Sequence, residues 1–307
     1  MPTLVAPLRS PGHGACSLVA VLCAAWAFAA TRAAAATPPT PSGVVEETLS
    51  VRVHGVAGDG SAFDQTIAVL VVRETAARPR PFLLLLHGRG ADAPARARQS
   101  VQSYPANSRY FAERGFIVLV PLRAGYGGSG GRDLEYSGEC ADKHFDAGIA
   151  AGLIETREVL ERAAAMPYVD AARGLVVGES VGGLIALAAG AAHLPGVVGT
   201  INVAGGDGGD SLNRPDEPCQ PDRLRQTFAR LGRNARIPSL WLYSANDRLW
   251  GPHYPAEWFA AYRAAGGRGS FVQLAADKNN GHFIFNRNAA AWQPAFERFA
   301  ASLRLSR

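Results

Sequence analysis

The sequence predicts an α/β protein with a mostly parallel central sheet, and two observations carry this prediction. Short, continuously apolar runs recur along the chain, and such runs are typical of parallel strands buried on both faces. These runs cover residues 82–86, 116–120, 175–177, 199–204, 240–243 and 271–274. Helical patterns separate most of them, at residues 146–165, 182–193 and 255–265, and a last one covers 290–303. Strands that alternate with helices in this way build a sheet with helices on both faces.

The part of the chain before these runs follows a different pattern. Residues 45–53 and 65–73 are rich in β-forming side chains with some alternation, and the turn sequence Gly58-Asp59-Gly60-Ser61 lies between them. This pattern predicts an antiparallel hairpin at one edge of the sheet. The chain has 307 residues, of which 48% are hydrophobic, and it shows neither an internal repeat nor a linker. We therefore expect one domain over residues 44–307.

The N-terminal residues 1–36 have the pattern of a signal peptide. Arg9 precedes an uncharged apolar run at 18–30, and an A-x-A cleavage site follows at 34–36. We expect cleavage there, a disordered mature start over residues 37–43, and a periplasmic or extracellular protein without stable membrane association. The apolar run is short for a membrane span, and Arg32 interrupts its extension. An uncleaved anchor that tethers the protein to the membrane is the alternative, and lipid attachment at Cys23 is a weaker one.

Two of the four cysteines, Cys16 and Cys23, lie within the predicted signal peptide. Cys140 and Cys219 remain, and two cysteines in an exported protein most simply form one disulfide. The alternative is a pair of free thiols, because the sequence does not show how close the two Cα atoms lie.

Charge and motif content bear on the expected partners. The formal net charge is +5, but the arginines are scattered among acidic residues without a dense basic block. We therefore expect no nucleic-acid binding. No Cys/His cluster has zinc spacing, and the glycine-rich stretch 124–131 lacks the lysine of a phosphate-binding loop. The sequence thus predicts neither a metal nor a cofactor.

Ser180 lies where a strand passes into a helix. The apolar run 175–177 leads into Gly178-Glu179-Ser180-Val181-Gly182, and a helical pattern follows directly. A G-x-S-x-G sequence in this context places a serine on a sharp turn with its hydroxyl exposed, which is typical of a nucleophile. The helix behind Ser180 offers unpaired N–H groups and a positive dipole end. The alternative is a glycine-rich turn without chemistry.

A serine nucleophile needs a general base and an acid that orients the base. His282 follows the last predicted strand, and Gly281 before it permits a tight approach. His282 is therefore the predicted base, and His253 and His144 are the alternatives. Asp247 stands immediately past the strand that contains residues 240–243, which makes it the predicted acid. Asp207, after the preceding strand, is the alternative acid.

Acyl transfer also needs donors for a developing oxyanion. The backbone amide of Val181 is one expected donor. The other comes from the loop after residues 82–86, with the Arg89 amide as first choice and the Gly88 amide as second. We expect His87 to shape that loop. The candidates for lining the substrate pocket are Tyr126, Glu179, Trp250 and Tyr254, whereas Trp258 fits core packing better.

These residues resemble a known group of enzymes. The matching segments are residues 87–90, 123–127, 178–183, 241–247 and 281–282. Together they resemble the dienelactone hydrolase and prolyl-oligopeptidase-like branch of the α/β-hydrolases. The resemblance implies an α/β-hydrolase fold with Ser180, Asp247 and His282 as a catalytic triad in that chain order. True dienelactone hydrolases use a cysteine nucleophile, so the serine here shifts the expected substrate to esters.

The resemblance and the residues together predict an exported serine hydrolase that cleaves small carboxylic esters through an acyl-enzyme. The insert at residues 205–237 is too short for a large lipase-type lid, so we expect a fairly open site. Two alternatives stay open at this point. One is a serine peptidase that acts on short peptides, and the other is a non-catalytic binding protein on the same fold.

Overall fold

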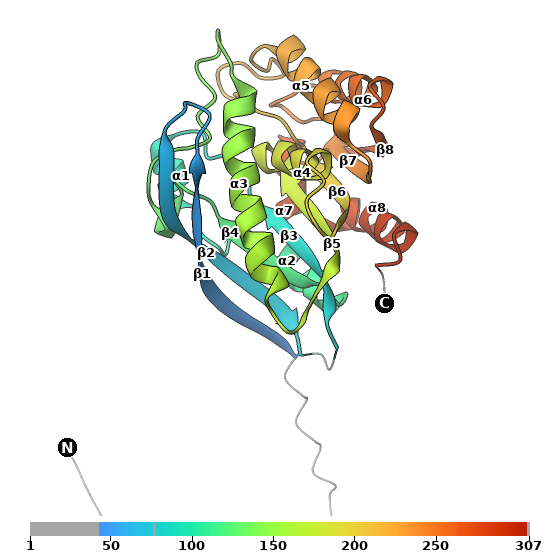
Figure 1. The fold of residues 1–307 in the computed structure, drawn as a ribbon. Coiled ribbons are helices and arrows are strands. Elements are labelled where there is room, and N and C mark those ends of the chain that lie inside the picture. The colour runs from blue at the N-terminus through green and yellow to red at the C-terminus, as the bar shows by residue number, and fades with distance from the viewer. Residues whose placement is uncertain (1–42, 76–77, 306–307) are drawn as a thin grey trace, which may run out of the picture. The chain divides into compact units, whose positions relative to one another are not determined.

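An eight-stranded sheet runs through the computed structural model, which describes residues 43–75 and 78–305 (Figure 1). The strand order is β1-β2-β4-β3-β5-β6-β7-β8. β2 pairs antiparallel with β1 and with β4, whereas all other neighbouring strands are parallel. The strands are β1 (Val44–Val56), β2 (Ala62–Glu74), β3 (Arg80–Leu86), β4 (Ile117–Leu122), β5 (Val169–Glu179), β6 (Val197–Val203), β7 (Pro238–Ser244) and β8 (Arg268–Leu274). The predicted fold class is confirmed, while the predicted signal peptide and residues 37–42 lie outside the described residues.

Helices cover both faces of the sheet (Figure 1). α3 and α4 pack on one face together with α5 and α6, and α2, α7 and α8 pack on the other. The α-helices are α1 (Ala93–Arg98), α2 (Pro105–Glu113), α3 (Phe145–Ala164), α4 (Val181–Ala191), α5 (Pro221–Asn234), α6 (Tyr254–Ala264), α7 (Ile284–Arg287) and α8 (Ala289–Ser302). Two 3-10 turns, η1 (Gly127–Ser129) and η2 (Gly281–Phe283), lie in the connections.

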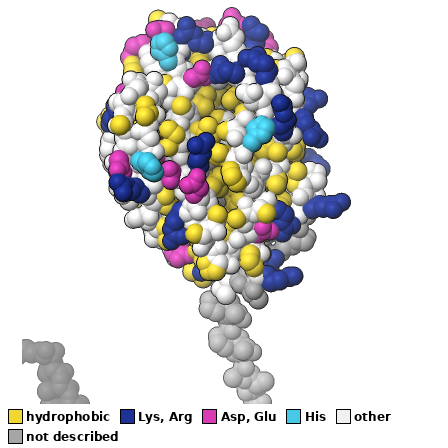
Figure 2. Space-filling model, viewed as in Figure 1, with side chains coloured by type: hydrophobic (Ala, Val, Ile, Leu, Met, Phe, Trp, Pro, Cys, Tyr) yellow, Lys and Arg dark blue, Asp and Glu magenta, His cyan; other side chains and the backbone are white. Residues whose placement is uncertain are grey.

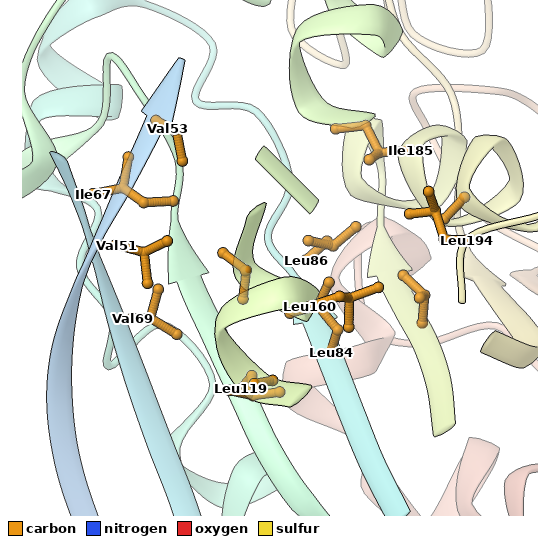
Figure 3. Packing of buried hydrophobic residues seen from close by; sticks show 14 of the residues in the cluster. Val51, Val53, Ile67, Val69, Leu84, Leu86, Leu119, Leu160, Ile185 and Leu194 are labelled. Carbon is orange, nitrogen blue, oxygen red and sulfur yellow. The ribbon is translucent and has the colours of Figure 1, made fainter. Parts of the chain in front are cut away.

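The continuously apolar runs form strands because both faces of the sheet are covered. In β3, Leu84 and Leu86 belong to the hydrophobic cluster beneath α3 and α4, which Figure 3 shows from close by. Leu83 and Leu85 point to the other face and belong to the cluster with α2 and α8. Successive side chains of a strand point to opposite faces, so a strand covered on both sides needs apolar residues at every position.

The edge strand β1 differs because its side chains alternate between buried or partly buried and exposed positions. In β1, Val51 and Val53 are buried, whereas Arg52 and His54 are exposed. The register pairs Val51 with Ile67 of β2, which is also buried. The predicted antiparallel hairpin is therefore present, and β1 has the alternation of a strand with one solvated face. On the face shown in Figure 2, Lys and Arg side chains lie interspersed with acidic and apolar ones.

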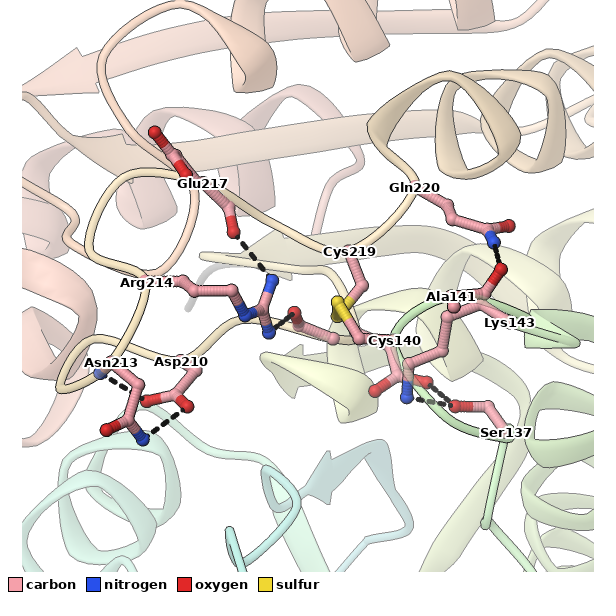
Figure 4. Close-up of a disulfide and its surroundings, with 12 residues drawn as sticks. Ser137, Cys140, Ala141, Lys143, Asp210, Asn213, Arg214, Glu217, Cys219 and Gln220 are labelled. Atoms are coloured by element: carbon pink, nitrogen blue, oxygen red, sulfur yellow. Dashed lines mark hydrogen bonds between the residues drawn. A yellow bond between two sulfur atoms is a disulfide. The ribbon is translucent and has the colours of Figure 1, made fainter.

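A disulfide joins two of the connections that follow strands. Cys140 lies between η1 and α3, and Cys219 lies in the insert between β6 and α5. Their Cα atoms are 5.0 Å apart, within the range that a disulfide bridges. Figure 4 shows the bond with Ser137 and Lys143 close to Cys140 and Arg214 on the side of Cys219. The predicted pairing of these two cysteines is present in the structure. No helix in the described part of the chain is long and apolar enough to cross a membrane.

We expect the disulfide to stabilise the fold because it closes a long loop. The two cysteines are 79 residues apart in the sequence. Replacing both (Cys140→Ser with Cys219→Ser) should lower the free energy of unfolding by about 2–4 kcal/mol, measured by urea denaturation. Treating the wild-type protein with a reductant should give the same shift and should leave the double variant unchanged. An unfolding midpoint that neither change moves would contradict this expectation.

Candidate active site

Ser180 occupies the sharp turn between β5 and α4 in a strained backbone conformation. Its φ is 57° and its ψ is −123°, a region that residues other than glycine rarely adopt. Backbone hydrogen bonds hold the turn: the Ser180 amide donates to Val203 at 2.9 Å, and the Gly206 amide donates to the Ser180 carbonyl at 3.2 Å. The strain is thus imposed by the neighbouring strand β6 and the loop after it.

The glycines that flank Ser180 are required by close backbone contacts. A Cβ atom on Gly178 would overlap the carbonyl of Gly182, and one on Gly182 would overlap the carbonyl of Leu86. Ser180 itself is 8% exposed. The spacing of the motif therefore reflects how tightly the helix start, the end of β3 and the serine turn approach one another.

His282 and Asp247 form a buried hydrogen-bonded pair. Asp247 follows β7, and His282 lies in η2, after β8. The His282 Nδ1 atom is 3.0 Å from Asp247 Oδ2 and 3.1 Å from Oδ1. His282 is 3% exposed and Asp247 is fully buried, and the Leu249 amide also donates to the carboxylate at 2.9 Å. This contact holds one ring nitrogen of His282 and leaves Nε2 for proton transfer.

Burial and two carboxylates determine the pKa of His282. Burial lowers it, but the charge and hydrogen bond of Asp247 and the charge of Glu179 outweigh burial. The pKa of His282 is therefore raised above its ordinary value of 6.5. The imidazolium form is stabilised by this surrounding, which suits a residue that must accept a proton during a reaction.

The side chains of Trp250 and Glu179 connect His282 to the serine turn. The Trp250 ring packs edge-on against His282, with ring centroids 5.5 Å apart, and its Nε1 donates to Ala204 at 2.7 Å. Ala204 directly follows β6, next to the loop that holds the Ser180 carbonyl. Glu179 directly precedes Ser180; burial raises the pKa of Glu179 above its ordinary value, and the nearby charge of His282 partly offsets this effect. The Ser180 hydroxyl makes no hydrogen bond to any residue in the described ranges.

The alternative bases and the alternative acid have other partners. Asp207 accepts a hydrogen bond from the Ser137 hydroxyl. The exposed His144 pairs with Asp142 at 3.1 Å, and the His253 ring lies against Tyr254 with centroids 4.1 Å apart. The structure thus brings His282 and Asp247 together, and neither alternative histidine makes a comparable buried pair among the described residues.

The loop after β3 faces the serine turn. A Cβ atom on Gly88 would lie 3.1 Å from the Ser180 Cβ. The Gly88 amide donates to the Tyr104 hydroxyl at 3.2 Å, so it is engaged. The amides of Arg89 and Val181 have no acceptor among the described residues. Val181 is the first residue of α4, where helix amides lack an intrahelical partner.

A buried ionic cluster, which the sequence did not reveal, contacts the loop after β3 through His87. It comprises Arg123, Glu135 and Glu155. The Arg123 guanidinium pairs with Glu135 and also donates to the His87 carbonyl at 2.8 Å. Burial and the neighbouring Glu135 raise the pKa of Glu155 to about 8, so Glu155 is mainly protonated at neutral pH. Only one of the two carboxyl groups in the cluster therefore needs to be charged beside Arg123.

The His87 side chain shapes the loop, as expected. Its Nδ1 is 2.8 Å from the Gly88 carbonyl, and its Nε2 accepts from the Arg123 amide at 3.1 Å. Burial is the largest cause that lowers the pKa of His87 well below its ordinary value, so the ring is neutral. A neutral ring has one donor nitrogen and one acceptor nitrogen, which matches these two contacts.

The pocket candidates lie deeper than expected from the sequence. Tyr126 is fully buried and donates to Glu135 at 2.6 Å, and Trp250 is 1% exposed. Glu179 is also buried, and its Oε2 accepts from Tyr104 at 2.7 Å. Tyr254 is half-buried and stacks on Trp258, which is a core residue, as favoured above. Tyr126, Glu179 and Trp250 therefore lie buried below the surface of the site.

The charge balance at His282 can be measured by NMR titration. We expect the pKa of His282 in the wild-type protein to exceed 6.5. Asp247→Asn should lower it because the imidazolium loses its carboxylate partner, whereas Asp207→Asn should leave it unchanged. The His282 signal is assigned from a His282→Gln variant. A wild-type value below 6.5 would contradict the balance described above.

Comparisons with known proteins place the chain in a family. A family model described as "Alpha/beta hydrolase family" matches residues 83–305. No curated protein matches the sequence.

Several solved structures share the fold. A putative dienelactone hydrolase from Klebsiella pneumoniae subsp. pneumoniae MGH 78578 superposes with a TM-score of 0.54 at 18% identity, covering 84% of this chain and 98% of the other. An acetyl xylan esterase from Paenibacillus sp. R4 gives a TM-score of 0.54 at 16% identity, with coverage of 86% and 89%. Dipeptidyl peptidase 4 from Porphyromonas gingivalis gives 0.54 at 15% identity, with coverage of 85% and 35%. The family match, the sheet order and the serine turn agree, and this chain belongs to the α/β hydrolase family.

Proposed function

We propose that this hydrolase is an exported serine esterase that cleaves small carboxylic esters through an acyl-enzyme. One observation carries the proposal: Ser180 lies on a strained strand-to-helix turn at the edge of the sheet where the buried His282–Asp247 pair is also placed. The proposed nucleophile, base and orienting acid each follow a different strand, which supports a Ser-His-Asp mechanism of acyl transfer.

The proposed reaction has two steps. His282 Nε2 takes the proton from Ser180 Oγ as that oxygen attacks the ester carbonyl carbon, and Asp247 stabilises the resulting imidazolium. The carbonyl oxygen becomes an oxyanion, and the unengaged amides of Val181 and Arg89 are its donors. The tetrahedral intermediate collapses, the alkoxide leaves with the proton from His282, and the acyl group stays on Ser180. Water, deprotonated by His282, then attacks the acyl carbon; His282 returns the proton to Ser180 Oγ as the bond to that oxygen breaks, which releases the acid and free Ser180.

One hydrogen bond bears on our choice of the second oxyanion donor. Gly88 and Arg89 were both candidates, but the Gly88 amide already donates to Tyr104. The Arg89 amide is unengaged, and its own side chain is held away by a bidentate pair with Asp133. We therefore assign the Arg89 amide, together with that of Val181, to the oxyanion.

Two features support the ester substrate, and two others support the export. Solved structures with this fold include an acetyl xylan esterase and a putative dienelactone hydrolase. The nucleophile here is a serine, which fits ester cleavage. The Cys140–Cys219 disulfide is typical of proteins in oxidising compartments, and the N-terminal sequence has the pattern of an export signal.

Replacing the nucleophile tests the proposal. Ser180→Ala should lower kcat for p-nitrophenyl acetate by at least about 1,000-fold, because the remaining groups cannot form the acyl-enzyme. Ser302→Ala, at the end of α8, is the matched control and should behave as wild type. Circular dichroism checks that both variants fold.

The same assay separates the alternatives. An ester panel and an aminoacyl-amide panel are run side by side with the wild-type protein. We expect turnover of the esters only. Faster turnover of amides than of esters would favour a peptidase, and undiminished turnover by Ser180→Ala would overturn the assignment of the nucleophile.

A further inference from the structure

Tyr104 lies at the junction of the three segments that build the candidate site. It is the residue just before α2, and it is buried. Its hydroxyl accepts from the Gly88 amide at 3.2 Å and donates to Glu179 Oε2 at 2.7 Å. Its ring packs against Phe285, three residues after His282, with centroids 5.7 Å apart. One side chain thus contacts the loop after β3, the residue before Ser180 and the segment that carries His282.

Hydrogen bonds hold both the backbone amide and the backbone carbonyl of Gly88. Its amide is held by Tyr104, and its carbonyl accepts from Gln99 Nε2 at 3.1 Å and lies 2.8 Å from His87 Nδ1. The Gly88 carbonyl and the Arg89 amide belong to the same planar trans peptide, so they point in opposite directions. The contacts of the Gly88 carbonyl therefore set the direction of the Arg89 amide, and Tyr104 holds the peptide on the other side of Gly88.

The Tyr104 hydroxyl donates to Glu179, a carboxyl group whose burial lowers the stability of the fold. Glu179 is buried, and its Oε1 has no hydrogen-bond partner in the described part of the chain. A buried carboxyl group with an unsatisfied oxygen lowers the stability of the fold, so its presence calls for an explanation such as a role in the site. Burial and the charge of Glu179 raise the pKa of Tyr104 well above its ordinary value, so the hydroxyl keeps the proton that it donates.

We propose that Tyr104, anchored by Glu179, is a positioning residue that holds the loop after β3 so that the Arg89 amide points at the oxyanion site. This inference rests on the proposed function, because it assigns a role within that reaction. The anchor is the residue directly before the nucleophile, so the Tyr104–Glu179 contact fixes the distance between the loop and Ser180. Its effect should appear in the transition state, where the oxyanion forms, and little in substrate binding.

Removing only the hydroxyl isolates this contact. Tyr104→Phe keeps the buried ring and its packing against Phe285. We expect kcat for p-nitrophenyl acetate to fall by about 10- to 100-fold with KM changed less than about 3-fold, because losing an oxyanion donor outright costs about 100- to 1,000-fold. The affinity for a trifluoromethyl ketone inhibitor, which forms a tetrahedral adduct on the serine, should fall in proportion to kcat/KM.

Tyr110→Phe is the matched control. Tyr110 is on α2 and also donates to a glutamate, Glu297 at 3.1 Å, but that contact lies outside the site. Its removal should leave kcat, KM and the inhibitor affinity unchanged. The thermal unfolding midpoints of both variants are measured, so that a loss of stability is told apart from a loss of positioning.

Variants of Glu179 test the anchor itself. Glu179→Gln keeps an acceptor oxygen for Tyr104 and should lose much less activity than Glu179→Ala, which removes it. The double variant Tyr104→Phe with Glu179→Ala should be no slower than the worse single variant, because both changes break one unit.

The outcomes separate this inference from the proposed function. An active wild-type protein with Tyr104→Phe within about 3-fold of it in kcat, or a loss confined to KM, would overturn the inference alone. Additive losses in the double variant would also overturn it. A folded wild-type protein that hydrolyses no ester and forms no inhibitor adduct would overturn the proposed function, and the inference would fall with it.

Discussion

The strained turn at Ser180 is the constraint on which the rest of the site depends. A non-glycine residue held at a φ of 57° costs about 1–3 kcal/mol, and it persists only where the surrounding structure fixes it. Here β6 holds the Ser180 amide and the loop after β6 holds its carbonyl. The buried parallel strands supply the rigidity that keeps this turn from relaxing. The Ser180 hydroxyl thereby lies at the carboxyl ends of the parallel strands, which the other candidate groups also follow.

The charges around this turn are balanced by burial and pairing. Asp247 is fully buried and is held by His282 and a backbone amide. Glu179 is a second buried carboxyl group beside the same histidine, and it shares its only hydrogen bond within the described ranges with Tyr104. A third carboxyl group, Glu135, is paired with Arg123 beneath the loop after β3. The surroundings of His282 and the loop after β3 therefore both depend on buried polar contacts, which are strong only while every member stays in place.

The sequence predicted the fold class because its apolar runs carry the signature of strands covered on both faces. It could not predict that β4 lies between β2 and β3, since strand order depends on how the helical connections cross the sheet. It also placed the start of β5 too late: the strand begins at the buried Val169, but residues 170–173 that follow are partly or fully exposed. Exposed residues in a strand lack the apolar signal on which the prediction rested.

For the site, the sequence pointed to residues that follow strands, and the pairing of His282 with Asp247 agrees with that reasoning. Tyr104 was missed because its partners, Gly88 and Glu179, lie 16 and 75 residues away and form no motif. Arg123, Glu135 and Glu155 were missed for the same reason. Trp250 and Tyr126 were proposed to line the pocket because they are aromatic and near the motifs, whereas burial depends on packing that a local pattern does not encode.

The most direct test of the account is covalent labelling of the nucleophile. The folded protein is incubated with a fluorophosphonate, digested and mapped by mass spectrometry. The account predicts one adduct per chain on the peptide that contains Ser180, lost in Ser180→Ala and strongly slowed in His282→Gln. No adduct, or an adduct on another serine, would contradict it.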